Sequence, residues 1–116
     1  MSSHIVFVID DDDDLRAAIC ESLEDDGFVA EGFARAEAAL EAISQRPPHV
    51  VIVDRWLPSM NGEEFVAALR AASHPVAVVL MSGDARFKVP LPEDVRVLPK
   101  PFDMSRLLDA VRSAVG

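Results

Sequence analysis

The side chains of this chain that are best suited to chemistry are three carboxylates, a hydroxyl and a lysine. Each stands at or just after the end of a short apolar run: Asp10, Asp11, Asp54, Ser82 and Lys100. Three carboxylates held close together repel one another unless a cation compensates them. Mg²⁺ is a hard cation that takes carboxylate, water and phosphate oxygens, and Mn²⁺ is a possible substitute. With the lysine, such a cation offsets the charge on phosphoryl oxygens, so the predicted chemistry is phosphoryl transfer to a carboxylate.

Two kinds of segment alternate along the chain and predict the elements that position these side chains. Five apolar runs suit strands buried on both faces: Ile5–Ile9, Phe28–Phe33, Val50–Val53, Val76–Met81 and Val95–Leu98. Apolar residues at helical spacing lie between and after them: Leu15, Ile19 and Leu23; Ala36, Leu40 and Ile43; Phe65, Leu69 and Ala72; Leu107, Leu108, Val111 and Val115. Gly27, the pair Pro47–Pro48 and the pair His74–Pro75 are expected to end the first three helices.

The alternation predicts an α/β fold with a doubly wound, five-stranded parallel sheet. For this sheet we expect the flavodoxin-like order 2-1-3-4-5. Ligands of such sheets bind beyond the carboxyl ends of the strands, and this is the edge at which all five polar side chains are expected. Each has a simpler interpretation as a helix cap, a turn residue or a surface corner. Because all of them fall at the same edge, a single site is the better interpretation.

Composition restricts the number of domains, the location of the chain and the kinds of partner it can bind. The chain has 116 residues, half of them hydrophobic, which suits one domain over residues 1–116. Its longest early apolar run has five residues, too few for a signal peptide or membrane span. A single cysteine, Cys20, excludes an internal disulfide, fits a cytoplasmic location and is expected to be a small buried hydrophobe. The net charge of −9 argues against nucleic acid or an anionic membrane as a direct partner, and the five aspartates at 10–14 account for most of it.

Four segments of the chain resemble the receiver domain of two-component response regulators, the CheY-like superfamily. They are residues 8–16 with the consecutive aspartates, residues 53–62 with Asp-x-x-Leu-Pro-x-Met-x-Gly, Leu80–Gly83, and Leu98–Phe102. The resemblance implies that Asp54 is the phosphoacceptor and that the donor is a phosphohistidine on a sensor histidine kinase or histidine phosphotransfer protein. It also implies a downstream target protein, and a signalling switch rather than a metabolic enzyme.

The resemblance further implies a role for each residue of the site. Asp11 would bind the metal directly and Asp10 through a metal-bound water, and the backbone carbonyl of Trp56 would complete the protein's ligands. Ser82 would hydrogen-bond one phosphoryl oxygen and Lys100 would pair with another. The Lys100–Pro101 peptide bond is expected to be cis. From its own chemistry, Gly62 is expected to allow a tight chain reversal.

Two departures from the family pattern concern how a signal would leave the site. The position three residues before Lys100, where receivers usually have an aromatic switch residue, is Val97, and the chain has no tyrosine. Residues 83–94 are fewer than the family usually has there, and Pro90 and Pro92 exclude a helix from the second half. We therefore expect the helix of this connection to be shortened or absent, with at most a turn over Ala85–Val89. We also expect that output does not use dimerisation through this face.

Some alternatives stay open. Trp56 is either an exposed loop residue without a role or a ring that limits the access of water to the phosphorylated aspartate. The whole chain could be a vestigial receiver that acts as an interaction module. Asp10-x-Asp12 also resembles the nucleophile motif of haloacid dehalogenase-like phosphatases, an interpretation that leaves Asp54 unexplained. The three histidines, His4, His49 and His74, are expected near the opposite end of the sheet, solvated or locally hydrogen-bonded.

Overall fold

Strands and helices alternate along the computed structural model, which describes residues 3–84, 86–87 and 91–115. The strands within these residues are β1 (Ile5–Ile9), β2 (Val29–Phe33), β3 (Val50–Asp54), β4 (Ala77–Ser82) and β5 (Val95–Pro99). The helices are α1 (Asp13–Asp25), α2 (Ala36–Gln45), α3 (Gly62–Ala71) and α4 (Met104–Val115). Every predicted strand is confirmed to within one residue at each end. Ala72 was wrongly included in the third helical stripe, because it is exposed and caps the end of α3.

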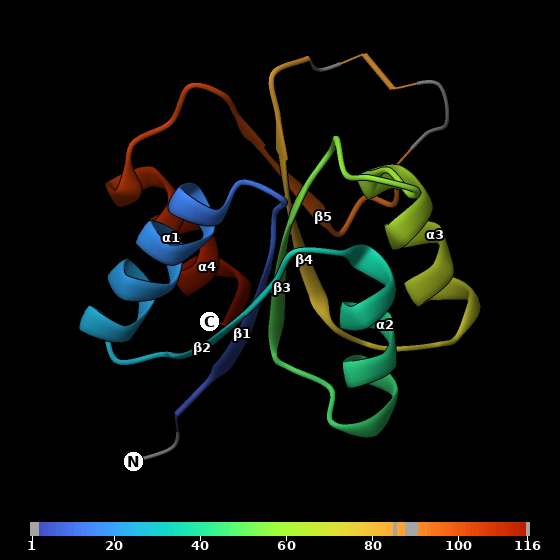
Figure 1. Ribbon diagram of the computed structural model, residues 1–116, viewed down its shortest axis with the longest axis horizontal. Helices are drawn as coiled ribbons and strands as arrows, with labels where there is room; N and C mark the ends of the chain where they lie inside the picture. The colour runs from blue at the N-terminus through green and yellow to red at the C-terminus, as the bar shows by residue number, and fades with distance from the viewer. Residues whose placement is uncertain (1–2, 85, 88–90, 116) are drawn as a thin grey trace.

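All neighbouring strands pair in parallel, and the sheet has the order β2-β1-β3-β4-β5. Helices α1 and α4 cover one face of the sheet, and α2 and α3 cover the other (Figure 1). The predicted doubly wound α/β fold is thus confirmed. Because all five strands are parallel, their carboxyl ends lie at the same edge of the sheet.

The central strands β1, β3 and β4 are almost entirely apolar because both of their faces are buried, whereas the edge strands β2 and β5 are partly exposed. In β1, Phe7 and Ile9 face the core beneath α2 and α3, whereas Val6 and Val8 face the core beneath α1 and α4. This two-residue alternation is the expected geometry of a strand between two layers of helices. Cys20 is partly buried against the second of these cores, where it acts as a small apolar side chain.

Local signals set the starts and ends of the helices. Asp12 caps α1, since its carboxylate accepts the backbone N–H groups of Asp14 and Leu15. Gly27 follows the end of α1 with φ of 92°, a left-handed conformation that costs glycine little. At the start of α3, Asn61 and Glu64 form a reciprocal capping box. The predicted stop after α1 is confirmed, whereas the capping box is a detail that the spacing analysis missed.

The connection from β4 to β5 has no helix among its described residues, 83–84, 86–87 and 91–94. This agrees with the prediction of a shortened or absent helix between these strands. The possible turn over Ala85–Val89 lies largely outside the described residues. Val97, the residue noted above as a departure from the aromatic residue usual in receivers, is 38% exposed on β5.

Two histidines at the amino end of the sheet make local contacts. His49 accepts the backbone N–H of Ile5 on its Nδ1 at 2.9 Å, and its ring contacts that of His4 edge-on at 4.8 Å between ring centroids. The predicted local hydrogen bonding is confirmed for His49.

None of the helices in the described ranges combines the length and apolar character that a membrane span requires.

Candidate functional site

Three carboxylates meet at the carboxyl edge of the sheet. Asp10 directly follows β1 and Asp54 ends β3, and these strands are neighbours with Ile9 opposite Val53. Oxygen atoms of Asp10, Asp11 and Asp54 all lie within 4.8 Å of one another. Asp10 and Asp54 are buried, whereas Asp11 is exposed. The structure thus brings together the three acidic side chains that were predicted to bind a metal.

Within the part of the chain that the structure describes, Asp10 has one carboxylate oxygen without a hydrogen-bond partner. Its Oδ1 accepts the backbone N–H of Asp12 at 2.9 Å, but its buried Oδ2 has no hydrogen-bond partner among the described residues. Burial raises the pKa of Asp10, and the negative charges of Asp54 and Asp11 raise it further, against the opposing effects of the Asp12 N–H and Lys100. A buried, unpartnered carboxylate oxygen beside two more carboxylates fits a hard divalent cation with oxygen ligands.

Lys100 supplies a fixed positive charge to the same cluster. Its Nζ lies 2.7 Å from Oδ1 of Asp54, and its backbone N–H donates to the carbonyl oxygen of Ser82 at 2.8 Å. The Lys100–Pro101 peptide bond is cis, as the family resemblance implied. The ion pair involves one oxygen of the Asp54 carboxylate.

Ser82 lies at the expected edge, but its hydroxyl is turned toward the following loop. The side chain is buried at the end of β4. Its Oγ donates to the carbonyl oxygen of Asp84 and accepts the Asp84 backbone N–H at 3.1 Å. A Ser hydroxyl in such a local turn is satisfied by the backbone. Its predicted bond to a phosphoryl group on Asp54 stays a prediction, and it would require this hydroxyl to turn.

Trp56 is the most exposed of the large apolar side chains in the described residues, at 62%. Its indole lies against the guanidinium of Arg55, with 4.9 Å between the guanidinium carbon and the ring centroid. The predicted metal-binding role of its backbone carbonyl stays a prediction, and both interpretations of its side chain remain open.

Arg55, which directly follows Asp54, was not predicted to take part in the site. Arg55 is 5% exposed and pairs through Nε with Glu63 in the first turn of α3, at 2.6 Å. Its two terminal nitrogens donate to the carbonyl oxygens of Asp84 at 3.2 Å and Arg86 at 2.8 Å. The sequence offered one signal: Arg55 directly follows a buried strand, and Glu63, of opposite charge, lies eight positions later. This signal was not specific, because such charge pairs are also common in exposed loops.

Arg16 belongs to the first segment of the family resemblance, but the sequence predicted no role for it; it supports the loop that carries Asp10. Its Nη1 donates to the carbonyl oxygen of Asp10 at 2.7 Å, and its Nη2 pairs with Asp13 at 2.6 Å. The stem of Arg16 lies across Gly32 of β2, where a Cβ atom would come within 3.1 Å of two of its carbons. A glycine at this point of an edge strand therefore leaves room for the arginine that fixes the acidic loop.

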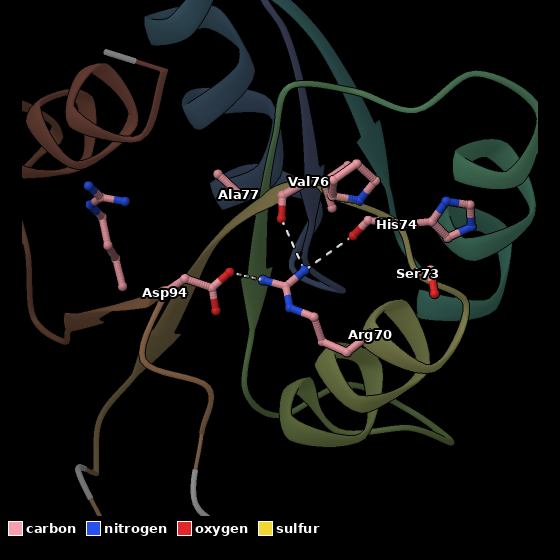
Figure 2. Close-up of a pocket in the computed structure, with 8 residues that line it drawn as sticks. Arg70, Ser73, His74, Val76, Ala77 and Asp94 are labelled. Atoms are coloured by element: carbon pink, nitrogen blue, oxygen red, sulfur yellow. Dashed lines mark hydrogen bonds and ion pairs between the residues drawn. The ribbon is translucent and has the colours of Figure 1, made fainter.

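The surface formed by the described residues includes the following two open hollows. One adjoins the carboxylate cluster and is lined by Leu15, Lys100, Pro101, Phe102, Asp103 and Met104. The other lies at the amino end of β4, around Arg70 (Figure 2). The Arg70 guanidinium donates to the carbonyl oxygens of His74 and Val76 and pairs with Asp94 at 2.7 Å. Arg70 therefore ties α3 to the strand ends, and the chemically capable groups lie at the opposite edge.

Comparisons with known proteins agree with this geometry. The family model described as response regulator receiver domain matches residues 6–112. The chain is 34% identical over 113 residues to the C4-dicarboxylate transport transcriptional regulatory protein DctD of Rhizobium meliloti, covering 94% of this chain and 25% of that protein. It is 32% identical over 117 residues to the transcriptional regulatory protein FixJ of Azorhizobium caulinodans, covering 96% and 54%.

The solved structures support the same fold. The chemotaxis response regulator CheY4 of Vibrio cholerae superposes with a TM-score of 0.85 at 24% identity, covering 97% of this chain and 99% of that one. At this identity the likeness concerns the fold alone. The chain spans about a quarter of the length of DctD and about half that of FixJ, so the similarity concerns one part of each relative.

Proposed function

The chain belongs to the response regulator receiver domain family, and from this we propose that Asp54 accepts a phosphoryl group from a phosphohistidine. The observation that carries the proposal is the cluster of Asp54 with Asp10, Asp11 and Lys100 at one sheet edge. The proposal takes residues 1–116 as a single receiver domain that acts as a signalling switch, not as a metabolic enzyme.

In the proposed reaction, an oxygen of the Asp54 carboxylate forms a bond to phosphorus as the bond from phosphorus to the histidine nitrogen breaks. The imidazole leaves with the electron pair of that bond, and the product is an acyl phosphate. Lys100, whose Nζ lies 2.7 Å from Oδ1 of Asp54, would pair with a phosphoryl oxygen once Asp54 is phosphorylated. The burial of Asp54 limits the water that competes with the donor.

Asp10, Asp11 and Asp54, with the backbone carbonyl of Trp56, would bind Mg²⁺, or Mn²⁺ in its place. When bound, the cation offsets the charge of the carboxylates and of the phosphoryl oxygens. The unpartnered Oδ2 of Asp10 supports this assignment. Ser82 would bind a second phosphoryl oxygen after its hydroxyl turns from Asp84 toward Asp54.

The proposed partners are proteins. A sensor histidine kinase or a histidine phosphotransfer protein would supply the phosphoryl group, and a downstream target would recognise the phosphorylated form. The acidic net charge of −9 supports the proposal that neither nucleic acid nor a membrane binds directly. A cytoplasmic location is proposed on the argument from the single cysteine.

Fluorescence of Trp56, the single tryptophan, offers the test. We expect the emission to change when Mg²⁺ is added and again when acetyl phosphate is added. Asp54→Asn should retain the fold and abolish the response to acetyl phosphate, with phosphorylation checked independently by intact-protein mass. Asp109→Asn, which changes an exposed carboxylate on α4, is the matched control and should respond as the wild type does. A folded wild-type protein that gains no phosphoryl mass would contradict the proposal and favour a phosphorylation-independent interaction module.

A further inference from the structure

Arg55 has a charge that is almost completely buried beside the proposed phosphoacceptor. A buried guanidinium is stable only when its donors are satisfied and its charge is compensated. Glu63 compensates the charge at 2.6 Å, and the carbonyl oxygens of Asp84 and Arg86 accept the remaining bonds. Because the guanidinium is planar and rigid, these contacts fix the backbone after β4 relative to the turn after β3. Arg55 thus orders a connection whose described residues include no helix.

Arg55 and Ser82 donate to the same atom. The carbonyl oxygen of Asp84 accepts from Nη1 of Arg55 at 3.2 Å and also from the Ser82 hydroxyl. A carbonyl oxygen has two lone pairs and can accept both bonds. The Ser82 hydroxyl, in contrast, has a single hydrogen, so it cannot donate to Asp84 and to a phosphoryl oxygen at the same time. The two arrangements of this hydroxyl exclude each other.

We propose that Arg55 is a positioning residue that keeps the Ser82 hydroxyl turned away from Asp54 until a phosphoryl group is present there. Arg55 does this through the Asp84 carbonyl, which it fixes in the place where Ser82 can donate to it. This inference rests on the proposed function, since it requires a phosphoryl group on Asp54. Because Arg55 already holds the Asp84 carbonyl in place, the hydrogen bond from Ser82 forms without a further entropy cost for ordering the loop. A phosphoryl oxygen on Asp54 must compete with this bond for the Ser82 hydroxyl, so the resting state is favoured until phosphorylation.

The same guanidinium connects this hydroxyl to the surface. It lies over the ring of Phe87 at 4.4 Å and over the exposed indole of Trp56 at 4.9 Å. When Ser82 leaves the Asp84 carbonyl, the contacts that orient Arg55 change, and with them the surroundings of both rings. In this chain, where Val97 replaces the usual aromatic residue, Arg55 offers a different path from Asp54 to the surface.

A double-mutant cycle between Arg55 and Ser82 tests the proposal. The readout is the affinity for beryllofluoride, a phosphoryl mimic, at saturating Mg²⁺, measured by fluorine NMR. Arg55→Lys keeps a positive charge for Glu63 but removes the two guanidinium nitrogens that donate to the carbonyl oxygens of the loop. We expect it to tighten beryllofluoride binding roughly three- to tenfold, because more of the free protein is then ready to bind. In the Ser82→Ala background, Arg55→Lys should change the affinity less than about twofold, since no hydroxyl is left to release.

A structural role alone gives a different result. It predicts that Arg55→Lys weakens binding, or changes it equally in both backgrounds, and either outcome overturns the proposal, as does an unchanged affinity. Asp109→Asn changes an exposed carboxylate on α4 that takes part in none of these contacts, so it is the matched control and should bind as the wild type does. Wild-type protein that binds no beryllofluoride would contradict the proposed function and this inference together.

A second measurement needs no variant of Arg55. The Nε–H of Arg55, which donates to Glu63, gives an NMR signal of its own. We expect beryllofluoride to shift that signal in the wild type and to shift it much less in Ser82→Ala. Shifts of equal size in the two proteins would show that Arg55 does not respond to Ser82, and would overturn the proposal even if Arg55→Lys fails to fold.

Discussion

At the scale of single residues, Asp10 is the side chain at which burial and charge oppose each other most directly. It is 2% exposed, close to the carboxylates of Asp54 and Asp11, and compensated by Lys100 and one backbone N–H. Its raised pKa means that the folded chain holds this proton more tightly than the unfolded chain does. The charged carboxylate is therefore unfavourable for the folded state and useful for binding a cation.

Asp10→Asn tests this opposition. Without divalent cations, we expect Asp10→Asn to raise the Tm by a few degrees at pH 7, the size of effect that ~1 kcal/mol has in a chain of about 100 residues. The stability of the wild type benefits from the proton on Asp10 below the ordinary pKa near 3.8, and loses that benefit as the pH rises through the raised value. The advantage of the asparagine should thus vanish near pH 4 and grow toward pH 7, as measured by thermal unfolding. An advantage that is constant with pH would contradict this explanation.

Which site residues could be predicted depends on what sets their position. The carboxylates and Lys100 follow apolar strands, so the sheet itself places them, and the strand pattern is visible in the sequence. Arg55 could not be predicted in the same way, because its burial depends on the path of the loop after β4 and on Glu63 in another element. The direction of the Ser82 hydroxyl was equally hidden, since the Asp84 backbone decides it.

At the scale of elements, the turn from β3 to α3 places the backbone of Asp54 against the start of a helix. Gly62 is buried there, and its N–H donates to the carbonyl oxygen of Arg55 at 2.7 Å. A Cβ at this position would lie 2.5 Å from a Leu80 methyl carbon and 3.0 Å from the Asp54 carbonyl oxygen. Gly62 is therefore required by close approach, and the tight reversal expected at this residue is explained by packing.

We expect Gly62→Ala to lower the free energy of unfolding by about 1–3 kcal/mol, because the added methyl group meets backbone atoms that cannot move away. Urea denaturation followed by circular dichroism measures this loss. Gly83→Ala is the control, since a Cβ at Gly83 meets no atom of the described residues within 4 Å. Equal stability losses in the two variants would contradict crowding as the cause, since no crowding is expected at Gly83.

The elements themselves were predictable because the central strands are continuous apolar runs that both helical layers bury, and the edge strands keep enough apolar residues to be recognised. The β4–β5 connection was predictable only in part. Pro90 and Pro92 indicated the loss of a helix. Prolines exclude a helix, but they do not indicate which side chains hold the segment to the rest of the fold. Here Arg55 and Phe87 hold the described part of that connection to the body of the fold.

At the scale of the whole molecule, the charge distribution predicts that divalent cations stabilise the fold. More than half of the net charge of −9 comes from residues 10–14, next to Asp54. A cation that binds only the folded site stabilises it by ~2.7 kcal/mol at 100 times its Kd. We expect Mg²⁺ to raise the Tm of the wild type accordingly, in a thermal scan with NaCl of equal ionic strength as the reference.

Two variants of the aspartate run separate specific binding from screening. Asp10→Asn removes a carboxylate of the cluster and should abolish most of the Mg²⁺ effect. Asp14→Asn removes an exposed carboxylate that is not part of the cluster and should retain it. If both variants respond equally, the cation acts on the overall charge and not at a site.

The strand order β2-β1-β3-β4-β5 also leaves β2 and β5 each with one side that pairs with no other strand of the described sheet. Such edges are places where copies of a protein can join through their backbones and aggregate. Both strands have only five residues, and Glu31 of β2 forms an ion pair with Arg46 at 2.6 Å. On β5, Arg96 donates to Ser113, and Pro99 has no N–H to offer to another strand. The short, charged edges therefore protect this domain from edge-to-edge aggregation.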